Sequence, residues 1–342
     1  MVMRRFILTF VAAAALPIAI ACGGDSDEGA DAKPTEAAVA TATATPTSPA
    51  ATPTPGPIVV TDARGQQITL KQPAARIVCL TGLCVDTLFV LGIKPVAAND
   101  ALHKHPAYWG PNERDIAPIG GSFREPSLED IAKARPDIVI GLVGIHDGLR
   151  TGLKDIAPLY IVNPIGIDGM LKHVQEIGLM VGKSKEAEEA GKALKKRLDD
   201  VSGKISTKKS VLVIFGSDIR IGVETTCTPT IDALSRVSNY AFVFEACARG
   251  EFPSFSLEQL LSIDPDVVFV MTLSFGPTPT TPVSQQLADN PLWKQLKAVK
   301  SGKVYEVSFD LWATSRGIRG ATAVLDEALP KIYPETFPAT SR

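Results

Sequence analysis

Residues 127–140, SLEDIAKARPDIVI, and residues 256–269, SLEQLLSIDPDVVF, share one pattern, and this pattern decides the expected fold. In each copy Ser-Leu-Glu is followed, after six residues, by Pro-Asp and an apolar run. The serine is placed to cap a helix, the proline ends that helix, and the apolar run predicts a buried parallel strand. The equal spacing predicts two equivalent α/β units.

The sequence around both copies alternates between strands and helices, which is typical of parallel α/β layers. Residues 58–70 predict a hairpin in front of the first unit. Between the two units, residues 168–205 contain almost only helix formers, with an apolar stripe that is interrupted at Gly182-Lys183-Ser184. We expect a long helix of about 20 residues here, preceded by a shorter one. We therefore expect an α/β protein with two Rossmann-like lobes joined by a single long helix: a first lobe at 58–167, a connecting helix at 168–206 and a second lobe at 207–342. Further helices are expected at residues 149–156, 230–236, 290–299 and 319–333.

The first residues are typical of a targeting segment rather than of the folded part. Arg4 and Arg5 precede an apolar run, residues 6–20, which is short for a membrane-spanning helix. Cys22 follows Ala21 in an arrangement that resembles a bacterial lipobox, whose cysteine is acylated. We expect a lipoprotein signal peptide at residues 1–21; ordinary secretion, with Cys22 merely near the cut, is the alternative.

Residues 22–57 are rich in Thr, Pro and Ala and predict a disordered tether. The other cysteines, Cys79, Cys84, Cys227 and Cys247, lack the spacing of a zinc or redox motif. An exported protein meets oxidising conditions, so Cys79–Cys84 and Cys227–Cys247 are candidate disulfides. The sequence leaves open whether either bond forms.

The charge balance argues against a nucleic-acid partner. The chain has 35 Lys and Arg residues against 37 Asp and Glu residues, a formal net charge of −2. We find no basic stretch interleaved with aromatic residues, which nucleic-acid binding would favour.

Several segments, in their order and spacing, resemble the periplasmic-binding-protein-like solute-binding proteins of ABC importers that carry iron–siderophores, haem and vitamin B12. They are Arg76-Ile77-Val78, the run at 88–92 with Lys94-Pro95-Val96, the two repeated units, and residues 298–305. The resemblance implies a class III fold: two compact lobes bridged by one long helix, with the ligand caught in the cleft between them. It also implies a lipid-anchored, extracytoplasmic protein that delivers a metal chelate to an ABC permease and its ATPase.

Within that resemblance a ferric siderophore is the first expectation for the ligand, and a corrinoid or haem is the alternative. The resemblance further implies that Glu129 and Glu258, one in each repeated unit, dock into the permease. The physical argument is consistent, because like charges at two ends of a rigid body specify orientation.

Ligand contacts are expected beyond the carboxyl ends of the strands, because open α/β sheets bind ligands there. Aromatic side chains suit a flat or greasy ligand, and arginines neutralise an anionic chelate with rigid, bidentate geometry. The candidates are Thr81, Cys84, Tyr108, Trp109, Phe123, Arg124, His146, Ser217, Phe275, Trp312, Arg316 and Arg319.

His103, His105 and His146 raise the question of direct metal ligation, but the chain has four histidines in all. We therefore expect neither a metal site of the protein's own nor a resident cofactor. The sequence shows no nucleophile elbow, Walker loop or zincin helix, so we do not expect an enzyme. An exported enzyme and an anchored sensor without an importer remain the alternatives from other classes.

Overall fold

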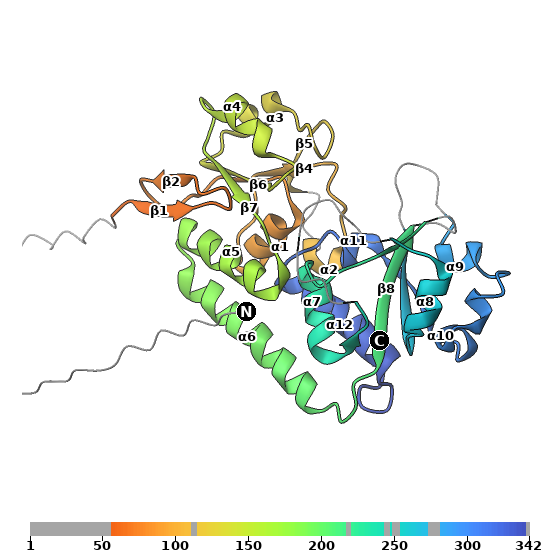
Figure 1. Cartoon of the computed structure of the whole chain (residues 1–342). Helices are drawn as coiled ribbons and strands as arrows, with labels where there is room; N and C mark the ends of the chain where they lie inside the picture. Colours follow the sequence, from red (N-terminus) through yellow and green to blue (C-terminus); the bar gives the residue numbers. More distant parts are fainter. Residues whose placement is uncertain are drawn as a thin grey trace, which may run out of the picture. The chain divides into compact units, whose positions relative to one another are not determined.

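The computed structural model describes residues 56–110, 115–216, 220–242, 247, 254–272 and 281–339. In this part of the chain two α/β lobes are each built on a separate sheet (Figure 1). Cys22 and the predicted signal peptide lie outside the described residues. Within the described ranges, no helix has the length and apolar character needed to cross a bilayer.

The first lobe begins with a hairpin of β1 (Ile58–Thr61) and β2 (Gln67–Leu70), whose turn is held by the buried carboxylate of Asp62. Its five-stranded sheet is parallel throughout, with the order β5-β4-β3-β6-β7. The strands are β3 (Ile77–Cys79), β4 (Ala97–Asn99), β5 (Ala117–Ile119), β6 (Ile138–Leu142) and β7 (Leu159–Val162). The helices of this lobe are α1 (Gly82–Val90), α2 (Pro106–Trp109), α3 (Leu128–Ala134), η2 (Asp147–Leu149) and α4 (Arg150–Leu153).

The second lobe has a mixed sheet with the order β11-β9-β8-β12-β13, and β10 also pairs with β8. Strands β8, β10, β12 and β13 run parallel, whereas β9 and β11 add an antiparallel edge. The strands are β8 (Ser210–Gly216), β9 (Ile221–Val223), β10 (Asn239–Tyr240), β11 (Ser254–Phe255), β12 (Val267–Thr272) and β13 (Val304–Ser308). The helices are α7 (Pro229–Val237), α8 (Leu257–Ile263), α9 (Val283–Gln286), η3 (Trp293–Gln295), α10 (Lys297–Lys300), α11 (Phe309–Trp312) and α12 (Ile318–Ile332).

The repeated sequence unit has the same structure in both lobes. Ser127 Oγ accepts the Asp130 backbone N–H at 3.2 Å to begin α3, and Ser256 caps α8 through Gln259 in the same way. Each helix ends on a left-handed residue in front of the proline, Arg135 (φ 46°) and Asp264 (φ 44°). Because β6 and β12 lie in different sheets, the prediction of two matching α/β units is confirmed.

The aspartate of each unit ties the unit to the neighbouring strand. Asp137 Oδ2 accepts the backbone N–H groups of Ala75 and Arg76 at 2.7 and 2.8 Å, just before β3. Asp266 Oδ2 accepts the Ser210 N–H at 2.9 Å, at the start of β8. In both lobes the aspartate carboxylate therefore accepts hydrogen bonds from backbone N–H groups at the start of a strand, which would otherwise be unpaired.

The connection between the lobes consists of a shorter helix followed by a helix of 20 residues, which confirms the expectation. These are α5 (Gly166–Met180) and α6 (Ser184–Gly203). The break falls at Gly182, whose φ of 71° lies in the left-handed region that glycine adopts at no steric cost. The chain then enters β8 and the second lobe.

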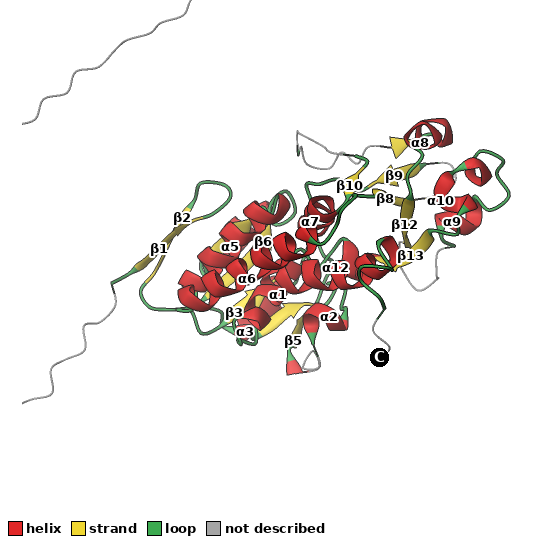
Figure 2. Cartoon of the chain, turned by 90° about the horizontal axis from the view of Figure 1, so that it is seen from below, coloured by secondary structure: helices red, strands yellow, loops and turns green. Residues whose placement is uncertain are grey.

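The two lobes are packed against one another and not only tethered. Helix α12 of the second lobe lies against α1 and α2 of the first lobe and against α6, as Figure 2 shows. Helix α7 of the second lobe likewise contacts α5. One continuous apolar core runs through both lobes by way of these helices, including Leu83 and Leu88 of α1 and Ala321 and Leu325 of α12. The lobes are therefore joined by direct packing as well as by the connecting helices.

Two predicted helices are shorter than expected. Residues 149–156 form only the single turns η2 and α4. Residues 290–299 break into η3 and α10, because Leu296 is extended (φ −58°, ψ 136°). The carboxylate of Asp264 accepts the Lys297 N–H at 2.7 Å and so begins a new turn. The short strands β9, β10 and β11 were not expected, because two or three residues are too few to show the alternation of side chains that marks a strand.

Both candidate disulfides are present in the structure, Cys79–Cys84 and Cys227–Cys247. The first joins the end of β3 to the first turn of α1. The second joins the segment before α7 to the region beyond β10. The sequence had left both bonds open.

Candidate functional site

A cavity of about 380 Å³ lies where loops of the two lobes meet, and we call it the interlobe pocket. On the first-lobe side it is bounded by residues that follow β3, β4 and β6, in agreement with the rule that ligands sit beyond the carboxyl ends of parallel strands. On the second-lobe side it is bounded by the residue after β9 and by the segment from α11 to α12. The lining residues are Thr81, Gly82, Ala101, Leu102, His103, Phe123, Leu142, Ile145, Glu224, Phe309, Ala313, Thr314 and Arg316.

Arg316 is the cation of this pocket. It lies in the short segment between α11 and α12, and its φ of 52° is a left-handed conformation that a side-chain-bearing residue rarely adopts. Its Nε donates to the Ala313 carbonyl at 3.2 Å, which fixes the base of the guanidinium group. Burial lowers the pKa of Arg316 and the Glu224 carboxylate opposes that shift, so the group stays charged. Backbone conformations of this kind gather at ligand sites.

Glu224 is the acid of the pocket, and sequence reasoning missed it. It follows β9 directly, its backbone N–H donates to the Val213 carbonyl at 3.0 Å, and it is only 3% exposed. Burial raises the pKa of Glu224, while the charge of Arg316 and hydrogen bonds from Thr225 and Thr228 oppose that rise. In the sequence, Glu224 is a single acid after a short apolar run at 221–223. This pattern is a weak indication of a pocket residue unless the run is already known to form the strand β9.

The first lobe reaches across the pocket through His103. His103 Nδ1 lies 2.7 Å from Asp310 Oδ1 in α11, and its ring meets Phe309 edge-on at 5.4 Å. The His103 backbone carbonyl accepts the hydroxyl of Tyr108 and the indole N–H of Trp109. Two buried aromatic residues thus hold the loop, and the contact between His103 and Asp310 joins the lobes at the pocket wall.

The turn from β3 into α1 forms the pocket's opposite edge. Thr81 and Gly82 line the pocket at the helix N-terminus, where the helix dipole favours negative charge. A Cβ on Gly82 would lie 2.3 Å from the Thr314 carbonyl oxygen of the second lobe. Glycine is therefore required here, because the backbones of the two lobes approach too closely for any side chain.

Of the twelve expected ligand contacts, Thr81, Phe123 and Arg316 are brought together around the pocket. Ser217 and Phe275 lie outside the described residues. Arg124 is exposed and does not line the pocket. Arg319 places its guanidinium over the ring of Phe89 at 5.6 Å instead of over the pocket.

The large aromatic residues expected as pocket walls belong to the core. Tyr108, Trp109 and Trp312 are each at most 1% exposed. The Trp312 ring packs on Phe269 at 4.7 Å, and its indole N–H donates to Glu327 at 2.8 Å. Burying such large apolar surface stabilises the fold. Among the residues that the structure describes, the aromatic rings that line the pocket are those of Phe123 and Phe309.

Cys84 and His146 are also engaged within the protein. Cys84 is bonded to Cys79. His146 is fully buried: its Nδ1 accepts the Leu142 N–H at 2.9 Å, and its Nε2 lies 2.7 Å from the Phe123 carbonyl. Burial lowers the pKa of His146, which favours the neutral ring. His146 therefore positions the Phe123 loop from behind and does not face the pocket.

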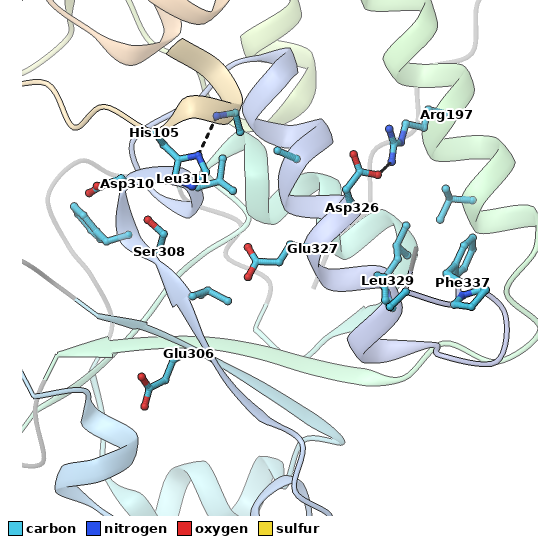
Figure 3. Close-up of a pocket in the computed structure, with 18 of the residues that line it drawn as sticks. His105, Arg197, Glu306, Ser308, Asp310, Leu311, Asp326, Glu327, Leu329 and Phe337 are labelled. Atoms are coloured by element: carbon cyan, nitrogen blue, oxygen red, sulfur yellow. Dashed lines mark hydrogen bonds and ion pairs between the residues drawn. The ribbon is translucent and has the colours of Figure 1, made fainter. Parts of the chain in front are cut away.

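A second, larger groove of about 1400 Å³ lies between α6, α12, β13 and the C-terminal segment (Figure 3). Carboxylates line it, and several are already engaged: Asp326 with Arg197, and Glu327 with Lys331 and Trp312. Figure 3 shows the pair of Asp326 and Arg197 at one end of the groove and Glu306 at the other. The smaller interlobe pocket is the better candidate, because it lies beyond the carboxyl ends of parallel strands, where open α/β sheets bind ligands.

Comparison with known proteins places the chain in a family. A model of the periplasmic binding protein family matches residues 77–311. YhfQ of Bacillus subtilis, whose name describes an ABC transporter substrate-binding lipoprotein, is 31% identical over 288 residues, covering 79% of this chain and 87% of that protein. The Fe(3+)-citrate-binding protein YfmC of the same organism is 26% identical over 287 residues, covering 80% and 86%.

Solved structures agree with this assignment. The petrobactin-binding protein YclQ of Bacillus subtilis superposes with a TM-score of 0.69 at 21% sequence identity, covering 82% of this chain and 99% of that one. At this level of sequence identity the superposition shows a shared fold, namely the two-lobed α/β architecture described above. The chain belongs to the periplasmic binding protein family.

Proposed function

We propose that this protein is the substrate-binding component of an ABC importer and that it captures an anionic ferric chelate in the interlobe pocket. The observation that carries the proposal is Arg316, a half-buried cation held by a left-handed backbone on the wall of a pocket between two lobes. Glu224 is the charged group that the described residues place near Arg316, and a bound anion would add a second partner for the guanidinium group on the pocket side. The family membership supports a role in solute capture.

A chelate with carboxylate donors fits the pocket best. Guanidinium groups bind carboxylates through paired, charge-assisted hydrogen bonds, and the dipole of α1 adds positive potential at Thr81 and Gly82. Phe123, Phe309 and Leu102 give the apolar remainder of the wall. The volume of about 380 Å³ lies at the small end of ligand pockets, which favours a compact ferric chelate over a macrocycle. The name of the relative YfmC, a Fe(3+)-citrate-binding protein, points the same way.

We further propose that the protein works outside the cytoplasm, anchored through an acylated Cys22. The names of relatives as substrate-binding lipoproteins support this location. Its partners are a permease and an ATPase. We keep Glu129 and Glu258 as the docking residues, because each is an exposed second residue of an equivalent capped helix in its lobe.

The test is isothermal titration of the purified protein with ferric citrate, a ferric hydroxamate, a ferric catecholate, haemin and cobalamin. We expect ferric citrate to bind with micromolar or better affinity and to be recovered intact. Arg316→Met should weaken this binding by roughly tenfold or more, because a charge-assisted hydrogen bond is lost.

Arg124→Met is the matched control, since Arg124 is exposed and does not line the pocket. It should leave the affinity for ferric citrate unchanged. Equal effects of the two substitutions would contradict a specific role for Arg316. Binding of haemin or cobalamin in place of ferric citrate would overturn the proposed ligand class, and chemical conversion of the chelate would overturn the transport role.

A further inference from the structure

A buried carboxylic acid, Glu224, lines the pocket that we propose for an anionic ligand. Glu224 is 3% exposed and shares the interlobe pocket with Arg316. A second negative charge beside a bound chelate would oppose binding. The proposed function gives Glu224 no task, so its presence points to a further property of the site.

Among the residues that the structure describes, Arg316 is the cation that acts on Glu224. Arg316 interacts with it electrostatically from the segment before α12. Within the second lobe, the Thr225 backbone N–H donates to Glu224 Oε2 at 3.4 Å, and Thr228 makes a further hydrogen bond with Glu224. The Tyr240 hydroxyl of β10 donates to the Glu224 backbone carbonyl at 2.8 Å. His103, paired with Asp310, is the titratable group across the pocket.

Chelate binding changes this balance of charge. In the empty pocket the positive charge of Arg316 stabilises the ionised form of Glu224. A chelate carboxylate that binds the guanidinium group neutralises that charge and brings a like charge toward Glu224. A like charge in a poorly solvated site disfavours ionisation, so the approach of the chelate raises the pKa of the Glu224 carboxyl group and favours its protonation.

We propose, on the basis of the proposed function, that Glu224 accepts a proton from solvent when an anionic chelate binds Arg316, so that chelate capture is coupled to proton uptake. The new O–H bond forms on the Glu224 carboxylate, and the proton comes from a buffer acid, which leaves as its conjugate base. Burial already raises the pKa of Glu224 above its ordinary value in the free protein. Because binding takes up a proton, the protein binds the chelate more tightly as the pH falls, by up to about tenfold per pH unit for one linked proton.

The experiment is isothermal titration with ferric citrate in buffers of different ionisation enthalpy, for the wild-type protein and for Glu224→Gln. The dependence of the observed heat on the buffer gives the number of protons taken up. We expect uptake of up to one proton by the wild type and a clearly smaller uptake by Glu224→Gln. Protonation of citrate itself is common to both proteins and cancels in the difference.

The affinity of Glu224→Gln gives a second, independent readout. Glutamine mimics the protonated acid, so at pH 7.5 the variant should bind ferric citrate as tightly as the wild type or up to about tenfold more tightly. Its affinity should also depend less on pH. His103→Gln removes the other titratable group of the wall, and the proton uptake should persist in this variant.

The outcomes separate the two proposals. If ferric citrate binds but Glu224→Gln takes up as many protons as the wild type, the proton acceptor is another group and the inference is wrong. If Glu224→Gln binds more weakly, Glu224 is a direct ligand contact and the inference is again wrong. If no ferric chelate binds the wild type, the proposed function itself fails, and the inference fails with it.

Discussion

The carboxylate of Asp86, in α1 of the first lobe, accepts the backbone N–H of Gly320, in the first turn of α12 of the second lobe, at 2.8 Å. It also accepts the Arg319 N–H at 3.0 Å. The residue before α12, Gly317, provides no side-chain cap of its own. Asp86 therefore caps a helix of the other lobe, and this contact joins the lobes next to the interlobe pocket.

We predict that this cap makes stability depend on pH. Burial raises the pKa of Asp86 from 3.8 to about 7, although the two amide donors oppose that rise. Between these values the folded protein holds a proton that the unfolded chain has released, so stability increases as the pH falls from 7 toward 4. From pH 7.5 to 5.5 the contribution is on the order of 2 kcal/mol. Urea unfolding of the wild type and of Asp86→Asn at both pH values measures it.

Asp86→Asn keeps a carbonyl acceptor for α12 but cannot titrate, which makes it the matched reference for this effect. The increase in stability on acidification should be smaller in the variant by the stated amount. An identical pH dependence in the two proteins would mean that Asp86 is already ionised at pH 5.5. Asp86→Ala should be the least stable at pH 7, by about 1–3 kcal/mol, because buried donors are left unpaired.

We predict that Gly320→Ala destabilises the protein at the same contact. A Cβ on Gly320 would lie 2.0 Å from Ser315 Oγ and 2.3 Å from Ser315 Cβ. Ser315 is fully buried and its hydroxyl donates to the Leu311 carbonyl at 2.7 Å, so it cannot move aside without losing that bond. Overpacking of this kind costs about 1–3 kcal/mol, measurable as a lower urea midpoint.

Gly203→Ala is the control for this substitution. Gly203 is the last residue of α6, and nothing lies within 4 Å of a Cβ placed there. Its stability should stay within about 0.5 kcal/mol of the wild type. A Gly320→Ala protein as stable as the control would show that the first turn of α12 is less tightly packed than described.

We predict that Glu129→Arg and Glu258→Arg each abolish uptake of radiolabelled ferric citrate by cells, while the purified variants keep the wild-type affinity for ferric citrate. Both side chains are exposed, and among the described residues Glu129 pairs with Lys133, four residues on in the same helix. Surface pairs of this kind contribute little to stability, so folding should be unaffected. Charge reversal at a docking surface disrupts association with the partner.

Glu188→Arg tests whether any charge reversal would have the same effect. Glu188 is an exposed residue of α6 that pairs with Lys192, also four residues on. It lies in neither repeated unit, so uptake should continue at the wild-type rate. Normal uptake by Glu129→Arg and Glu258→Arg would contradict their role in docking, and loss of ferric citrate affinity would show that they support the fold.

The comparison of sequence and structure is most informative at the pocket. Arg316 and Phe123 could be predicted because both follow elements whose carboxyl ends face the cleft. Trp109 and Trp312 satisfied the same rule, yet their rings are buried, because position along the chain does not say which way a side chain turns. Glu224 could not be predicted, since its place on the wall depends on the three-residue strand β9.

The sequence by itself determined the two α/β lobes, their helical connection and the repeated capped unit, because helix caps, proline and hydrophobic period are local signals that act over a few residues. Only the tertiary structure decided that α12 packs back on the first lobe, that Asp86 caps it, and that Arg316 and Glu224 share one pocket. These are contacts between residues far apart in the chain, and they depend on how two preformed lobes fit against each other.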